Sequence, residues 1–427
     1  MGRGEEIRAA GRVVGDALAG AVGVVRDIHQ AVADRSFTVA GPAARPVQAV
    51  HDVIAGGVYA VVRGAHFVLP RVAATAAVYG FPPDQAPLSQ SRSGRFALAA
   101  VNGLWGDTLS GRHPELATVM AVRSRCADVA LTAEALRATF PQATPRIALF
   151  AHGFCETEEY WSLSSRKHYG VERATLGSRL RRDLGYTPVY VRYNTGLHVS
   201  DNGMRLAELL DDLIAGWPVP VEEVSFVGHS MGGLVIRSAC QHAATGSHPW
   251  VSLVRHVVCL GTPHLGAPLE KGVNAAAWLL ARLPETRPVA RLLNQRSVGV
   301  KDLRFGALLE ADWRDADPDA LLRDNCTEVP FLPHAAYYFI GATVTRGRDN
   351  PLATIIGDLF VRFPSASGGG RRRRVPFALD NGRHLGGLHH FDLLNHPDVH
   401  DQLCAWLAGE AGDGTPGPRG RVPGCAS

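Results

Sequence analysis

Residues 224–236 read Val-Ser-Phe-Val-Gly-His-Ser-Met-Gly-Gly-Leu-Val-Ile, which places a Gly-x-Ser-x-Gly motif between an apolar run and a segment with helical spacing. A short run rich in Val and Phe is typical of a buried strand. A serine at the turn between such a strand and a helix is held in a strained backbone conformation that lifts its hydroxyl clear of the sheet. Larger side chains at Gly228 or Gly232 would collide with neighbouring backbone. The stretch therefore predicts a nucleophile elbow with Ser230 at its tip.

Further short apolar runs along the chain have the character of buried strands, because glycine, proline or a polar turn bounds them. Between two of them, leucines recur at helical spacing up to Ile214, and Ser200 and Asp201 are predicted to cap that helix. Strands that alternate with helices predict a mostly parallel sheet covered by helices on both faces. The expected strands are residues 147–151, 189–193, 224–227, 257–260 and 337–340.

The chain divides into regions of different character. Residues 1–110 are rich in Ala, Val and Gly at helical spacing and predict a helical N-terminal region. We expect it to pack on the catalytic domain; lining an acyl pocket, dimerising and resting on a membrane surface are the alternatives. Residues 111–408 predict the α/β domain, with a helical cap insertion at about 269–330, and the Gly- and Pro-containing tail 409–427 predicts disorder.

The composition is ordinary for a soluble protein of 427 residues, with 46% hydrophobic residues and a net charge of +4. Basic residues are scattered except at Arg371–Arg374, so we expect no nucleic-acid partner. Seven cysteines without a Cys-x-x-Cys pair argue against a disulfide framework. The apolar stretch Val53–Tyr79 is interrupted by arginines and a proline, so no membrane-spanning helix is expected. We expect a cytoplasmic protein, with peripheral membrane contact through the N-terminal helices as the alternative; the oligomeric state stays open.

A serine hydroxyl is a weak nucleophile at neutral pH, so Ser230 requires a histidine base, and that base requires an acid. In this arrangement the chain order is serine, acid, histidine. His390 is the expected base because it lies on a loop before the C-terminal helix, and His389 is its direct rival. Asp358 is the expected acid because it lies between apolar residues, where a carboxylate would be desolvated unless paired. Asp349 and Asp380 also satisfy the order, whereas Asp392 does not.

Ester cleavage through an acyl-serine also requires N–H groups that face the developing oxyanion. The backbone N–H of Met231 is one expected donor, because it begins the helix after Ser230. The backbone N–H of Phe154, in the loop after the 147–151 strand, is the other, and Gly153 allows close approach of the backbone. His152 is expected to be a structural histidine of that loop.

Residues 146–408 resemble the α/β-hydrolase superfamily, in particular bacterial lipases and esterases and the related inositol-deacylase-like group. The shared motifs are His152-Gly153, the elbow at 228–232, Gly-Thr-Pro-His-Leu-Gly at 261–266 and His390-Phe391. In that family an Asp-Gly-x-Val loop commonly carries the acid, and this chain has Asp-Leu-Phe-Val at 358–361. The resemblance implies an α/β-hydrolase fold and an esterase or lipase that needs no metal or cofactor.

The expected activity is therefore cleavage of carboxylic esters, with a small-molecule or lipid ester as substrate. Trp278, Leu279 and Leu280 in the insertion favour a hydrophobic acyl group. An acyltransferase or thioesterase with the same triad is the alternative, because one scaffold hosts several acyl-transfer reactions. A non-catalytic binding protein of this fold is the third hypothesis.

Overall fold

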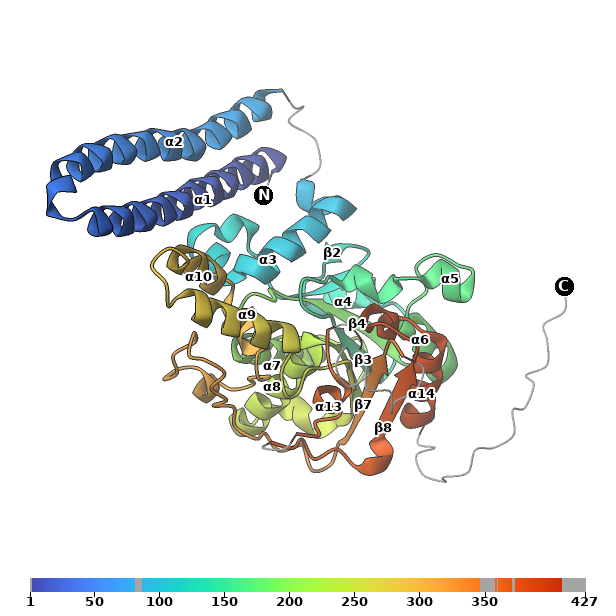
Figure 1. The fold of residues 1–427 in the computed structure, drawn as a ribbon. Helices are drawn as coiled ribbons and strands as arrows, with labels where there is room; N and C mark the ends of the chain where they lie inside the picture. Colours follow the sequence, from blue (N-terminus) through green and yellow to red (C-terminus); the bar gives the residue numbers. More distant parts are fainter. Residues whose placement is uncertain (1, 81–86, 346–357, 359, 371–372, 409–427) are drawn as a thin grey trace.

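The computed structural model describes residues 2–80, 87–345, 358, 360–370 and 373–408, and the predicted tail 409–427 lies outside them. One eight-stranded sheet, in the order β2-β1-β4-β3-β5-β6-β7-β8, forms its centre (Figure 1). All neighbouring strands from β4 to β8 pair in parallel, whereas β1 pairs antiparallel with both β2 and β4. The mostly parallel α/β fold expected from the sequence is confirmed.

The five expected strands are all present, and three more extend the sheet at its edges. The expected ones are β3 (Arg146–Ala151), β4 (Thr187–Arg192), β5 (Glu223–His229), β6 (Val254–Leu260) and β7 (Ala336–Thr343). The additional strands are β1 (Ala121–Ser124), β2 (Ala127–Asp128) and β8 (Gly382–Gly386). These lack an apolar run because edge strands are short or partly exposed, so the sequence pattern gave no signal for them.

Two apolar cores, one on each face, hold helices against the sheet. Successive side chains of β3 alternate between them: Ile147 and Leu149 belong to one core, and Ala148 and Phe150 to the other. This alternation explains why a strand buried on both faces reads as a continuous apolar run. The first core includes side chains of α7 (Val199–Ala215) and α8 (Met231–Gly246), and the second includes α6 (Leu176–Leu184) and α14 (Pro397–Leu407).

Helix α7 starts one residue earlier than its predicted cap. Its first turn begins at Val199, so Ser200 and Asp201 lie inside the helix and do not cap it. The carboxylate of Asp302 takes that role from a distant segment, since it accepts a hydrogen bond from the Val199 N–H at 2.8 Å. A cap donated from across the fold leaves no local pattern, which is why the sequence interpretation was wrong here.

The N-terminal region consists of a long helical hairpin and one shorter helix (Figure 1). Helices α1 (Arg3–Ala40) and α2 (Arg45–Tyr79) lie side by side, joined by a turn at Gly41, whose φ is 83°. Helix α1 contacts the rest of the protein and α2 lies on its outer side. Helix α3 (Arg92–Arg112) packs directly against the α/β region. By length and hydropathy alone, Pro42–Tyr79 could cross a membrane, in contrast to the expectation from its interruptions.

The insertion between β6 and β7 contains three α-helices. They are α9 (Pro268–Leu280), α10 (Arg287–Asn294) and α11 (Val298–Asp302). Downstream, Arg373 does not simply extend into solvent, because its guanidinium donates to the carbonyl oxygens of His264 and Phe305. The Gly- and Arg-rich segment is therefore partly fastened to the insertion.

Candidate active site

Ser230 lies at the turn between the end of β5 and the start of α8. Its φ of 52° and ψ of −121° are strained for a residue with a side chain. A Cβ atom on Gly228 would lie 2.5 Å from the Gly233 nitrogen, and one on Gly232 would lie 2.2 Å from the Ala151 oxygen. Both glycines are therefore sterically required, and the local geometry is that of a nucleophile elbow.

His390 and Asp358 form a buried pair. The Nδ1 atom of His390 lies 2.7 Å from Oδ2 of Asp358, and each side chain is 4% exposed or less. The other carboxylate oxygen of Asp358 accepts the backbone N–H groups of Phe360 and Val361 at 3.0 and 2.7 Å. The backbone N–H of His390 also donates to the Asp358 carbonyl at 3.1 Å. Both residues are thus fixed by side-chain and main-chain bonds.

The pKa values of the two residues are shifted in the directions that general-base catalysis requires. Burial works to raise the pKa of Asp358, but the adjacent His390 charge and the hydrogen bonds to the carboxylate lower that pKa below its ordinary value. Burial works to lower the pKa of His390, but the Asp358 carboxylate raises it above the ordinary value. The carboxylate therefore stays ionised and stabilises a protonated imidazole.

The rival residues lie elsewhere. The His389 side chain is 53% exposed and faces Asp392, with 3.4 Å between Nε2 and Oδ2. Asp380 is exposed and lies in the short turn just before β8. Asp349 lies outside the described residues. Among the expected acids that the structure describes, Asp358 is the one that contacts His390.

Ser230 and His390 line the same cavity, which has a volume of about 310 Å³. Most of its wall is apolar and comes from four places: the loop after β3, helix α3, the insertion with α9 and α11, and the segments next to Asp358 and His390. Of the carboxylate and guanidinium groups in the wall, Glu270 and Arg296 pair with each other at 2.6 Å, and Glu156 contacts His229. The apolar lining consists of Leu104, Phe154, Pro263, Ala267, Leu269, Val273, Val300, Leu303, Phe360, Val361 and Phe391.

Of the two expected oxyanion donors, Phe154 lines this cavity and Met231 directly follows Ser230 in the chain. Met231 is the first residue of α8, and Phe154 follows β3 in the neighbouring loop. Within the described parts of the chain, neither backbone N–H has a hydrogen-bond acceptor. Unpaired N–H groups beside Ser230 are what an oxyanion site needs.

Helix α3 supports the loop that carries Phe154. The Cys155 N–H donates to Oγ1 of Thr195 at 3.2 Å, and its backbone has a φ of 59°. A Cβ atom on Gly103 of α3 would lie 2.3 Å from the Cys155 sulfur, so the helix packs tightly on the loop. Leu104 of the same helix reaches the cavity. Part of the N-terminal region thus lines the cavity, which is one of the alternatives that the sequence left open beside simple packing on the catalytic domain.

His152 is wholly buried and has structural partners. Its ring stacks on Tyr193, with 4.5 Å between ring centroids, and its Nδ1 lies 2.9 Å from the Gly153 carbonyl oxygen. Burial lowers its pKa. These contacts favour the structural role expected for it over that of a second base.

A second buried pair, Glu156 and His229, lies beneath the site and was not expected from the sequence. The Glu156 carboxylate accepts the Gly153 N–H at 2.7 Å and lies 2.9 Å from Nδ1 of His229. The Nε2 atom of His229 lies 3.1 Å from the carbonyl oxygen of His390. Both ring nitrogens of His229 therefore face hydrogen-bond acceptors. The pair joins the oxyanion loop, the elbow and the His390 segment.

Replacing Glu156 by Gln should destabilise the protein strongly. Burial works to raise the pKa of Glu156, but the His229 charge holds it below its ordinary value, so the carboxylate is charged. Glutamine would remove the buried carboxylate that contacts both His229 and the Gly153 N–H, and breaking a buried pair of this kind costs about 3 kcal/mol of unfolding free energy. Urea denaturation measures the loss. Glu172→Gln is the matched control, because its ion pair with Arg166 is exposed; an equal loss in both variants would contradict the assigned role.

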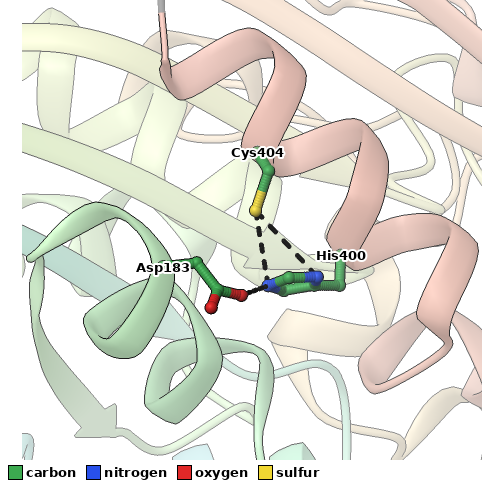
Figure 2. Close-up of side chains that lie close together, drawn as sticks. All are labelled: Asp183, His400 and Cys404. Atoms are coloured by element: carbon green, nitrogen blue, oxygen red, sulfur yellow. Dashed lines mark hydrogen bonds and ion pairs between the residues drawn. The ribbon is translucent and has the colours of Figure 1, made fainter. Parts of the chain in front are cut away.

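One further cluster has side chains that could bind a metal: Asp183, His400 and Cys404 (Figure 2). The Nε2 atom of His400 lies 3.1 Å from Oδ2 of Asp183 and 3.3 Å from the Cys404 sulfur. An Arg179 N–H approaches Nδ1 of His400 at 3.0 Å, and Oδ1 of Asp401 lies 3.3 Å from the same nitrogen. The contacts of His400 with Asp183 and Arg179 tie α6 to α14.

Comparisons with known proteins agree with this architecture. Residues 173–314 match the PGAP1-like alpha/beta domain family. No curated protein gives a significant match to the chain.

Three solved structures show the likeness. Lipase BlEst2 of Bacillus licheniformis in its mature form is 20% identical, with a TM-score of 0.39, covering 62% of this chain and 94% of its own. EstA from Clostridium botulinum is 14% identical, with a TM-score of 0.37, covering 63% and 88%. An alpha/beta hydrolase fold protein from Chitinophaga pinensis is 12% identical, with a TM-score of 0.35, covering 62% and 90%.

These structural scores are low, so the fold assignment rests on the strand order, the elbow and the family match. A parallel sheet whose central strand ends in a strained serine elbow, with a histidine and an acid on later loops, is the α/β-hydrolase arrangement. The chain therefore has an α/β-hydrolase fold, and residues 173–314 within it match the PGAP1-like alpha/beta domain family.

Proposed function

We propose that this protein is a serine hydrolase that cleaves carboxylic esters with a hydrophobic acyl group. The observation that supports it most is the joint placement of Ser230 and the buried Asp358–His390 pair at one apolar cavity. A positive-φ serine, an oriented base and unpaired amides form a constellation that acyl transfer uses.

In the proposed mechanism, Asp358 holds the proton of His390 on Nδ1, which leaves Nε2 free to accept a proton. Ser230 Oγ attacks the ester carbonyl while its proton passes to Nε2. The oxyanion of the tetrahedral intermediate accepts hydrogen bonds from the backbone N–H groups of Phe154 and Met231. His390 then gives its proton to the departing alkoxide, leaving an acyl-Ser230 ester. Water, deprotonated by His390, releases the acid and restores the serine.

The lining of the cavity supports a hydrophobic acyl group. Its charged wall residues are already paired, since Glu270 contacts both Arg296 and Arg304. The remaining surface is mainly aliphatic and aromatic, so it gains most from contact with methylene groups. A charged or strongly polar acyl group would lose hydration there without replacement.

A series of p-nitrophenyl esters from acetate to palmitate tests this proposal. We expect kcat/KM to rise by about fourfold for each added methylene until the cavity is filled. Val273→Trp, within the cavity wall, should move the optimum to shorter acyl chains, whereas Val171→Trp, on an exposed loop away from the cavity, should not. A rate that is independent of chain length would contradict the acyl preference.

A fluorophosphonate probe tests whether Ser230 is a nucleophile, separately from the preference for a hydrophobic acyl group. It should label Ser230, because a nucleophilic serine beside an oriented base attacks the probe. Labelling without hydrolysis of any ester in the series would favour transfer of the acyl group to an acceptor other than water. Absence of labelling in the folded protein would contradict a serine hydrolase of any kind.

A further inference from the structure

The outer face of α2 is apolar along its whole length. Its members recur at helical spacing and therefore share one side of the helix. Each side chain is between 49% and 87% exposed, although all are aliphatic or aromatic. This outer face of α2 comprises Val47, Val50, Ile54, Val58, Val61, Val68, Val72 and Tyr79.

The polar side chains of α2 that take part in ion pairs or hydrogen bonds turn the other way, toward α1. Asp52 accepts a hydrogen bond from Gln30 of α1 at 3.0 Å, and Arg71 reaches Asp16 of α1 at 2.5 Å. A hairpin on the surface of a protein in water normally has the opposite arrangement, with apolar side chains in the seam and polar ones outside. Polar groups inside and apolar groups outside are characteristic of helices that contact lipid.

The seam between the two helices is also closely packed. A Cβ atom on Gly11 would lie 2.3 Å from that of Ala74, and one on Gly15 would lie 2.7 Å from the Phe67 carbonyl oxygen. Small residues spaced by four let helix backbones approach, as they do between helices in a bilayer. The hairpin therefore keeps its shape without needing its apolar outer face for internal packing.

The outer face of α2 carries no charged residue. Among the exposed positions of this helix, the charged residues are Arg45 at its start and Arg63 near its middle, and helical spacing places both on the side of Asp52, away from this face. An uncharged apolar face is complementary to the apolar boundary of a bilayer.

The way α1 is fixed decides how α2 would meet a bilayer. Near its start, Glu6 bonds the Ser89 N–H; near its end, Arg35 pairs with Glu285 at 2.7 Å. Because α1 is held along its length, α2 lies parallel to the protein surface on the far side of α1 (Figure 1). A perpendicular crossing would pull the hairpin off these contacts, although an 18-residue window within Pro42–Tyr79 has a mean hydropathy of 1.4 and no buried residue. This geometry favours contact of the whole outer face of α2 with a bilayer over insertion of α2 across it.

We propose that the outer face of α2 docks flat on the surface of a lipid bilayer. A second copy of the chain fits less well, because two helices that pack on each other need only a narrow apolar seam. Here the exposed apolar surface is wider than one seam. It also includes Val53 and Phe67 at the flanks of α2, and Val25 and Val32 on α1. The proposal rests on the hairpin alone and does not depend on the hydrolase function.

Co-sedimentation with vesicles tests the proposal. The full chain should bind vesicles of equimolar phosphatidylcholine and phosphatidylglycerol, because the outer face of α2 is apolar and uncharged. Val61→Glu combined with Val68→Glu should weaken binding to the mixed vesicles on the order of tenfold or more, since charged groups would enter the apolar boundary. Val119→Glu with Val171→Glu is the matched control, because these valines are similarly exposed elsewhere.

The outcomes separate the possible occupants. Unchanged melting temperatures in both double variants show that any loss of binding does not come from unfolding. Failure of the full chain to bind the mixed vesicles, or equal binding by both double variants, would overturn the proposal. So would a dimer in solution that the α2 double variant converts to a monomer, because the face would then be covered by a second copy. Loss of ester hydrolysis has no bearing on these readings.

Discussion

Ser230→Ala should reduce kcat for a soluble p-nitrophenyl ester by about a millionfold. Alanine retains the methylene but removes the atom that forms the acyl-enzyme, so the two-step route is lost. The cavity and the unpaired amides of Phe154 and Met231 would remain, and such elements alone can leave a rate above that in water. Stopped assays at high enzyme concentration, with labelling by a fluorophosphonate probe alongside, measure the loss.

The fold of this variant should be intact. The strain at Ser230 lies in its backbone, with φ at 52°, and alanine bears the same strain as serine. The hydroxyl of an exposed serine, Ser252, gives the matched control, since Ser252→Ala removes the same atom away from the cavity. Hydrolysis by Ser230→Ala at a rate near that of the control would contradict the assignment of the nucleophile.

Much of the core and of the proposed triad could be predicted because the information is local. Continuous apolar runs identify strands buried on both faces, and those runs correspond to β3 to β7. The elbow is similarly local, since its glycines and serine lie within five residues. Asp358 was predicted from chain order and an apolar surrounding, and the structure places it 2.7 Å from His390. In this chain Leu359 follows the acid where the family commonly has glycine, and Asp358 still makes that contact.

The contacts that were missed join segments far apart in the chain. Glu156 and His229 are separated by 73 positions, and neither has a sequence neighbour that reveals the pair. The same holds for Leu104 of α3, which lies on a helix outside the region of resemblance and still reaches the cavity. Only tertiary packing determines which of many buried polar or apolar residues meet. Edge strands such as β8 were missed for a different reason, because partial exposure removes the apolar pattern.

The hairpin illustrates a limit of reading hydropathy from sequence. Arg71 and Pro70 appear in the sequence as interruptions of an apolar helix, and they argue against a helix that spans a membrane. In the structure both residues lie on the side of α2 that faces α1, where Arg71 pairs with Asp16 and Pro70 packs near Gly11. The apolar outer face is therefore uninterrupted there. Whether a polar residue opposes contact with lipid depends on the face of the helix that it occupies, and composition alone does not show that face.

Asp358→Asn should lower kcat by about four orders of magnitude, because an amide cannot stabilise the imidazolium and can hold the wrong tautomer of His390. The variant also has a distinct effect on pH dependence. The carboxylate raises the pKa of His390, and the base works only when neutral, so the rate of the wild-type protein rises with pH through that raised value. Without the carboxylate the pKa of His390 falls, and the residual activity should persist to lower pH. Pre-steady-state acylation rates across pH measure both effects.

Asp380→Asn is the control for that experiment, because Asp380 satisfies the same chain order but is exposed. It should retain the wild-type rate and the wild-type pH midpoint. A merely structural role for Asp358 would lower the amount of folded protein without moving the midpoint, whereas a role in orienting His390 moves it. Loss of activity in Asp380→Asn with a normal Asp358→Asn would mean that the buried 2.7 Å contact is not the one that catalysis uses.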